Sequence, residues 1–213
     1  MSPLAPITIH AEVDMRERPA VLYGAQQLAE ALRAASGVDW PIQLTFWGAR
    51  RLRAAAGNVV VLSLLCEVES DEPFAETAAR WRRRTDGLAA EGAIVMLLTV
   101  FRAVSGRRTE KGQHLLERIR RLDRMALDLS RDIGVTVVDI DRAFAHIGAR
   151  ALATDYRLAG RVAAEVAGHT FALSLLSLGL DDTIPVQVQE RARTHHGSLR
   201  EIDTLVRRRL AAG

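Results

Sequence analysis

Three polar residues near the start of the chain have side chains that could bind a metal ion. His10, Glu12 and Asp14 alternate along a β-branched run, so in an extended chain they would point to one face. One imidazole and two carboxylates could hold a divalent cation, but alternating polar residues at a strand end are also typical of a hydrogen-bonded edge. We favour the edge, and we predict no metal ion and no other cofactor.

A thiol and several carboxylates could also take part in catalysis. Cys66, the only cysteine, could act as a nucleophile, but no histidine lies near it in the sequence, so a small buried apolar side chain is the better interpretation. One cysteine excludes an internal disulfide and a Cys-based zinc site, and fits a reducing compartment. Four carboxylates could supply an acid/base pair for glycosidic chemistry, although we expect salt bridges to Arg102, Arg142 or Arg157. These carboxylates are Glu12, Glu67, Glu69 and Asp155.

Short β-branched runs alternate with longer helical patterns, and these elements must position the polar residues. The alternation is typical of βαβ units around a parallel sheet. The third and fourth runs are apolar on both faces, as expected of a sheet covered by helices on each side. The predicted strands are Ile7 to Val13, Ile42 to Phe46, Val59 to Leu65, Ile94 to Val100 and Val135 to Ile140. Asp139 and Asp141, which flank the end of the last strand, are expected to cap or brace the loop that carries Asp155.

The segments between the strands have helical spacing. One long helix is predicted to end at Gly134, and a second, from Val21 to Leu32, ends near Gly37. A third begins beside Pro73, a residue favoured in a first helical turn. The last long helix is expected over about Leu158 to Leu178. The apolar stripe of the helix before Gly134 consists of Leu115, Ile119, Leu122, Ala126, Leu129 and Ile133.

The pattern changes after Leu180. Two aspartates and Pro185 break the helical spacing, so we predict a linker or surface arm as far as residue 197. Ser198 and Glu201 have the spacing of a capping box, and the helix that follows has an apolar side. That side must pack on its own domain, which we favour, or on a partner chain. The predicted units are an α/β domain over residues 1–180 and a linker with a C-terminal amphipathic helix over residues 181–213.

The composition is that of one folded domain without a strongly charged surface. The 213 residues are 48% hydrophobic and 26% charged, and basic residues exceed acidic ones by 29 to 26. Trp81 of the basic run Arg80–Arg84 belongs to an apolar helix stripe, so we predict no nucleic-acid partner. The amino terminus lacks a secretory pattern and no apolar stretch could span a bilayer, so we expect a cytoplasmic protein. The Arg-rich, Lys-poor composition indicates a GC-rich bacterial source.

The chain resembles the SGNH/GDSL hydrolase superfamily, with the best similarity from Val59 to about Leu178. The tract RIRRLDRMALDLSRDIGVTVVDIDRAFAHIGARALATDYRLAG, residues 118–160, is similar to the late part of such a domain, where a long helix and the last strand lead to an Asp-x-x-His motif. The resemblance implies a three-layer α/β/α fold with a five-stranded parallel sheet, as in flavodoxin-like folds, here with a C-terminal helical arm. It places Asp155 at the motif's aspartate and Leu158 at its histidine.

The other motifs of the family are also incomplete in this sequence. The Gly-Asp-Ser motif after the first strand would fall near residues 10–12, and no serine occurs between Ser2 and Ser36. Gly48 matches the glycine that contributes a backbone N–H to the oxyanion hole, but residues 65–69 hold no asparagine for the third motif. Without the serine and the histidine, acyl transfer of this kind has no mechanism.

We therefore predict a catalytically inactive SGNH-hydrolase-like protein that binds a ligand in its cleft or a protein partner through its surface. The alternative is an active esterase or deacylase acting on an acylated carbohydrate or another small ester. Its nucleophile would be Ser63, Ser105 or Cys66, and its base would be His10 or His169. A third hypothesis makes the C-terminal arm a docking element in a homo-oligomer or a larger assembly. The predicted ligand cleft is lined by His10, Glu12, Trp47, Cys66, Glu67, Glu69 and Arg102.

Overall fold

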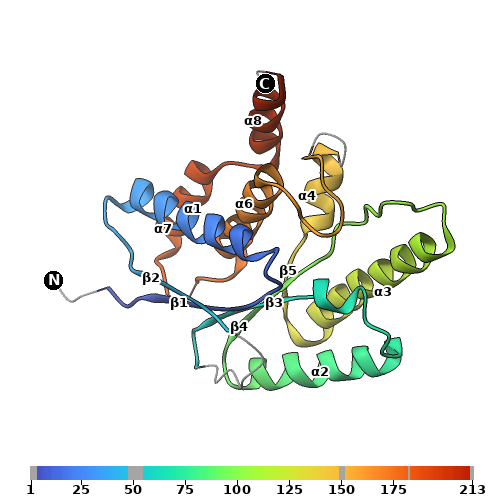
Figure 1. Ribbon diagram of the computed structural model, residues 1–213. Coiled ribbons are helices and arrows are strands. Elements are labelled where there is room, and N and C mark those ends of the chain that lie inside the picture. Colours follow the sequence, from blue (N-terminus) through green and yellow to red (C-terminus); the bar gives the residue numbers. More distant parts are fainter. Residues whose placement is uncertain (1–3, 48–54, 149–151, 182, 212–213) are drawn as a thin grey trace.

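Five parallel strands form one sheet in the order β2-β1-β3-β4-β5 (Figure 1). The computed structural model describes residues 4–47, 55–148, 152–181 and 183–211. The prediction of an α/β fold around a five-stranded parallel sheet is confirmed. The strands are β1 (Ile7–Glu12), β2 (Ile42–Phe46), β3 (Val59–Ser63), β4 (Ile94–Leu98) and β5 (Thr136–Val138).

Helices cover both faces of this sheet, which gives three layers (Figure 1). Helices α1, α4, α6, α7 and α8 lie on one face, and α2 and α3 lie on the other. The helices are α1 (Arg18–Ser36), α2 (Phe74–Ala90), α3 (Glu110–Ile133), α4 (Ile140–Ile147), α6 (Arg161–Leu178), α7 (Val186–His196) and α8 (Leu199–Ala211).

The sheet separates two apolar cores, because successive side chains of a strand point to opposite faces. All five residues of β3 are buried. Val59 and Val61 pack into the core that includes residues of α1 and α6, whereas Val60 and Leu62 pack into the core that includes residues of α2 and α3. Because apolar side chains fill both faces of the central strands, functional side chains must lie at the ends of these strands.

The helix boundaries agree with the predicted signals. Gly37 and Gly134 end α1 and α3 in the left-handed conformation, with φ of 70° and 85°. Pro73 directly precedes α2. At the start of α3, the Thr109 side chain accepts a hydrogen bond from the backbone N–H of Gly112 at 3.1 Å, which satisfies one of the unpaired donors of that helix end.

Helices α1 and α6 cross in very close contact, because glycines occupy the crossing point. A Cβ atom on Gly168 would lie 2.7 Å from the backbone oxygen of Ala20 and 2.8 Å from the backbone nitrogen of Gly24. A Cβ atom on Gly24 would lie 2.4 Å from the ring of Phe171. Larger side chains at either glycine would push the two helices apart.

Three segments differ from the sequence-based prediction. Residues 186–196, expected in a linker, form α7, because the polar segment docks through a few residues such as the fully buried Ala192. β5 ends at Val138, since the Asp139 side chain accepts from the backbone N–H of Arg142 and begins α4. β3 ends at Ser63, and residues 65–67 form a 3-10 turn that turns the chain toward α2.

The C-terminal helix α8 folds back on its own domain. The Glu201 carboxylate accepts from the backbone N–H of Ser198, as the predicted capping box requires. Ile202 and Val206 are buried in the core on the α6 side, and α8 contacts α6 and α4. In the described ranges, no helix has the length and apolar character needed to cross a membrane.

Candidate functional site

The carboxyl edge of an open parallel sheet is where ligands bind, in particular where the connections after two neighbouring strands leave toward opposite faces. In this chain that point lies between β1, which is followed by α1, and β3, which is followed by α2 (Figure 1). Polar side chains come to this edge from residues 13–17, from residues 64–69 and from the loop 154–158.

Glu17 and Ser63 form a buried pair between β1 and β3. Only 1% of Glu17 and 3% of Ser63 are exposed. The Glu17 carboxylate accepts from the backbone N–H of Asp14 at 3.0 Å and from the Ser63 hydroxyl, yet burial raises the pKa of Glu17 to about 7. The Ser63 oxygen also accepts from the backbone N–H of Leu65 at 2.9 Å. A substrate in solvent would not reach this serine without movement of the edge.

Cys66 reaches the surface of the same edge, but its thiol is a poor nucleophile there. The Sγ atom lies 3.7 Å from the backbone oxygen of Ser63 and 3.7 Å from Oε1 of Glu67. The residue as a whole is exposed, contrary to the expected burial. Burial of the thiol and the negative charges of Glu67 and Glu17 raise its pKa to about 12. The reactive thiolate is therefore almost absent at pH 7.

Glu67 braces the turn after β3 rather than facing solvent. It is 5% exposed, its Oε2 lies 2.8 Å from Nη2 of Arg80, and its Oε1 accepts from Nε1 of Trp81 at 3.0 Å. Arg118 of α3 donates to the backbone oxygen of Glu67 at 2.6 Å. Both carboxylate oxygens are thus occupied within the protein, and the turn is tied to α2 and α3.

A network of ion pairs joins the loop 154–158 to the residues after β3. The Tyr156 hydroxyl donates to the Glu69 carboxylate, and Arg157 lies 3.6 Å from the same carboxylate. Hydrogen bonding to Tyr156 and the positive charge of Arg157 lower the pKa of Glu69. The Asp155 carboxylate lies 3.3 Å from Nη1 of Arg157 and accepts from the Ser105 hydroxyl at 3.4 Å. The predicted salt bridges of Glu69 and Asp155 to Arg157 therefore exist.

The structure shows where the residues lie that the family resemblance assigned to catalytic motifs. Residues 10–12, where the Gly-Asp-Ser motif was expected, lie within β1, which ends at Glu12, and Val13, Asp14 and Met15 follow the strand. Met15 is 76% exposed at this edge. Leu158, which the resemblance assigned to the histidine position, is buried in the core with a φ of 56°. Gly48 lies outside the described residues.

His10 and Glu12 point toward the α2 side of the sheet, away from the edge network. Nδ1 of His10 accepts from Nε1 of Trp47 at 3.0 Å, and Nε2 of His10 lies 3.3 Å from the side-chain nitrogen of Asn58. Glu12 pairs with Arg84 of α2. In the part of the chain that the structure describes, no three His, Cys, Asp or Glu side chains form a group that could hold a metal ion.

Arg102 lines a cavity of about 440 Å³ beyond the ends of β4 and β5. Its Nη2 lies 2.6 Å from Oδ2 of Asp141, and its backbone N–H donates to Oδ1 of the same residue at 2.9 Å. Asp123 of α3 also lines the cavity. Its Oδ1 accepts from the backbone N–H of Val100 at 2.9 Å, but its Oδ2 is buried without a partner. Burial raises the pKa of Asp123 to about 7.

The predicted cleft residues therefore occupy three separate places. His10, Glu12 and Trp47 lie on the α2 side of β1 and β2, Cys66 to Glu69 lie after β3, and Arg102 lines the cavity after β4 and β5. Sequence reasoning missed Glu17 and Asp123. The sequence contained a sign that Asp123 is buried, because it lies four residues after Ile119 and so falls on the apolar side of its helix. It contained no such sign for Glu17, since the burial of Glu17 depends on contact with a strand far away in the sequence.

Comparison with known proteins adds information on the fold. No protein-family model matches this chain, and no curated protein is detectably similar to it. Among solved structures, "a putative SGNH hydrolase from Slackia heliotrinireducens" matches with a TM-score of 0.51 and 14% sequence identity, over 80% of this chain and 100% of that one. At this identity the likeness shows the fold alone, so the chain has an SGNH-hydrolase-like fold.

Proposed function

We propose that this chain is a catalytically inactive SGNH-hydrolase-like domain that binds a small anionic ligand in the cavity lined by Arg102 and Asp123. One observation carries the proposal: a cavity of about 440 Å³ lies at the carboxyl edge of the sheet and includes a buried carboxylate oxygen without a partner. A buried polar atom without a hydrogen bond is costly. With a pKa raised to about 7, Asp123 is protonated part of the time at neutral pH, and the protonated carboxyl group can donate a hydrogen bond from Oδ2 to an anion in the cavity.

The charge of the cavity favours an anion. Arg102 and Asp141 neutralise each other, and Asp123, with a pKa raised to about 7, is only partly ionised at neutral pH. Arg120 and Arg142 form no ion pair within the described residues. The N-terminus of α4, which adds partial positive charge, begins at the same place. The charged lining residues are Arg102, Arg120, Arg124 and Arg142 with Asp123, Asp139 and Asp141.

Inorganic phosphate is a simple probe of this site. We expect saturable binding by isothermal titration calorimetry, weakened about tenfold or more in Arg142→Gln, because a hydrogen bond to a charged group contributes about 1.5–3 kcal/mol. Arg83→Gln is the matched control, since Arg83 is exposed on α2 and does not line the cavity. Binding that does not saturate, or that weakens equally in both variants, would show that the cavity is not the site.

A fluorophosphonate probe tests the absence of catalysis. The structure supports inactivity because Ser63 is buried and because burial raises the pKa of the Cys66 thiol to about 12. The family resemblance also places Leu158, which cannot act as a base, at the histidine position. We expect no adduct in the intact mass of the protein under conditions that label a control serine hydrolase fully. A stoichiometric adduct would overturn this part of the proposal and leave the anion site as a separate question.

An active esterase or deacylase is the second candidate, and the Glu17–Ser63 pair favours it. A carboxylate whose pKa lies near 7 and which is bonded to a serine hydroxyl could act as a general base. This candidate requires a fluorophosphonate adduct on Ser63 that Ser63→Ala and Glu17→Gln abolish. Ser105→Ala, which removes a serine from the Asp155 loop instead, should leave the adduct intact.

We favour ligand binding over a role in assembly through the C-terminal helix. Ile202 and Val206 pack against their own domain, so this part of the apolar side of α8 is already covered. The partner hypothesis stays a prediction.

A further inference from the structure

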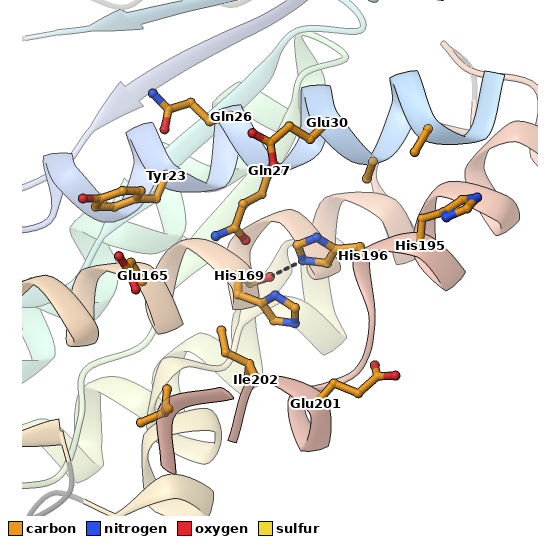
Figure 2. Close-up of a pocket in the computed structure, with 13 residues that line it drawn as sticks. Tyr23, Gln26, Gln27, Glu30, Glu165, His169, His195, His196, Glu201 and Ile202 are labelled. Atoms are coloured by element: carbon orange, nitrogen blue, oxygen red, sulfur yellow. Dashed lines mark hydrogen bonds between the residues drawn. The ribbon is translucent and has the colours of Figure 1, made fainter. Parts of the chain in front are cut away.

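A second cavity, of about 560 Å³, lies among helices α1, α6, α7 and α8 (Figure 2). It exists because α7 and α8 pack beside the close crossing of α1 and α6. The residues of the carboxyl edge discussed above do not line it. Its size is in the usual range for a small-molecule site. The inference below is therefore independent of the proposed function.

Two polar atoms at this cavity are buried without a hydrogen-bond partner. They are Nε2 of His169, a residue that is only 7% exposed, and Oε1 of Gln27. Figure 2 shows the Gln27 side chain extending from α1 toward α6, which carries His169. Each of these atoms costs folding free energy as long as it stays unpaired. Two such atoms on facing helices indicate a built site.

The two histidines of the cavity hold one another in position. The rings of His169 and His196 stack with centroids 4.0 Å apart and planes at 19°. Nε2 of His196 donates to the backbone oxygen of His169 at 3.0 Å, which settles the tautomer of the neutral His196 ring. Burial lowers the pKa of His169 to about 4, and burial also lowers the pKa of His196. Both rings are neutral at pH 7, so neither adds positive charge to the cavity.

The lining is acidic. Glu30, Glu165 and Glu201 line the cavity, and its described lining includes no Arg or Lys. Glu165 pairs with Arg161, 2.9 Å away. Glu30 and Glu201 form no ion pair among the described residues, although Oε2 of Glu201 accepts from the backbone N–H of Ser198. The described histidines and carboxylates do not form a group of three that could hold a metal ion. Hydrogen-bond acceptors beside negative charge select a ligand that donates hydrogen bonds and is itself positive.

We propose that this cavity binds an aliphatic diamine or polyamine, whose ammonium groups donate to His169 and Gln27 while Glu30 and Glu201 balance their charge. The ligand has no acidic group, because the described lining offers no cation to bind one. Amino acids are therefore poor ligands for this cavity, although they carry an ammonium group.

Calorimetric titration with 1,4-diaminobutane tests this inference. We expect saturable one-to-one binding to the full chain that weakens about tenfold or more in His169→Phe and in Gln27→Leu. His169→Phe keeps an aromatic ring against His196 and removes the unpaired nitrogen, but it also removes the hydrogen bonds of the His169 ring to the backbone of Ser198 and Gly197, so circular dichroism and thermal unfolding must show that the variant is folded before its binding is compared. Glu30→Gln should weaken binding as well.

The controls separate a specific site from general attraction to acidic surface. Glu117→Gln removes an exposed helical carboxylate on α3, on the other side of the sheet, and should leave binding unchanged. Succinate, which has the same chain length and two negative charges, should not bind in the cavity. Absence of diamine binding, equal binding by a well-folded His169→Phe variant, or equal weakening in Glu117→Gln would each overturn the inference.

Discussion

Gly168→Ala is expected to destabilise the protein by about 3 kcal/mol, although alanine normally stabilises a helix relative to glycine by about 0.5–1 kcal/mol. The reversal comes from the crossing of α1 and α6. The added methyl group would lie 2.7 Å from the backbone oxygen of Ala20 and 2.8 Å from the backbone nitrogen of Gly24, and both are backbone atoms that cannot rotate away. Helix α6 would have to shift, together with the core that it shares with α1.

Urea denaturation followed by circular dichroism measures this effect, and Gly87→Ala is the matched control. Gly87 lies inside α2, and nothing lies within 4 Å of the place that its Cβ atom would take. The control variant should therefore gain about 0.5–1 kcal/mol from helix propensity alone. If Gly168→Ala were as stable as Gly87→Ala, our inference that α1 and α6 are too close for a methyl group at Gly168 would be wrong.

Glu17→Gln is expected to stabilise the protein by about 2–3 kcal/mol at pH 8 and by far less at pH 4.5. The folded chain holds the Glu17 proton up to a pKa of about 7, whereas the unfolded chain releases it near 4.5. Between these values the folded state binds more protons than the unfolded state, so stability falls as the pH rises. Glutamine is neutral throughout and removes this loss.

The comparison must be made between the variant and the unmodified chain at each pH, because other groups also titrate. Asp123, with a pKa raised to about 7, acts in the same direction as Glu17. His169, with a pKa lowered to about 4, acts in the opposite direction, since its contribution is lost as the pH falls below 6.5. Asp123 and His169 are present in both proteins, so their contributions cancel when the free energies of unfolding of the variant and the unmodified chain are subtracted. Urea titrations at several pH values measure the free energy of unfolding of each protein, and Glu117→Gln is the control for an exposed carboxylate. If the difference between Glu17→Gln and the unmodified chain did not change with pH, Glu17 would not have the raised pKa of a buried carboxyl group.

Periodicity predicted most of the elements, because helices and strands bury residues at regular spacing. The stripe from Leu115 to Ile133 predicted most of α3, and Gly134 its end. The apolar run from Val59 predicted a strand buried on both faces, which β3 is. The prediction of a linker over residues 186–196 was wrong, because it rested only on the polar character of this segment. The segment contains few apolar side chains, yet it forms a helix that buries Ala192.

The candidate site was less accessible to sequence reasoning than the elements. Arg102 was predicted as a cleft residue from its place after β4, and it does line a cavity, because parallel strands bring their carboxyl ends to one edge. Glu67 was predicted by the same reasoning, but Arg80 and Trp81 occupy its carboxylate. Position after a strand does not tell whether a carboxylate faces a ligand or a neighbouring helix.

The sequence by itself determined the order of strands and helices along the chain and the two-sided burial of the sheet. These follow from local spacing and residue identity, which need no knowledge of the folded chain. Only the tertiary structure decided which distant side chains meet: Glu17 with Ser63, Arg118 with Glu67, and His169 with His196. Burial and pKa arise from such contacts, and they depend on how whole helices pack.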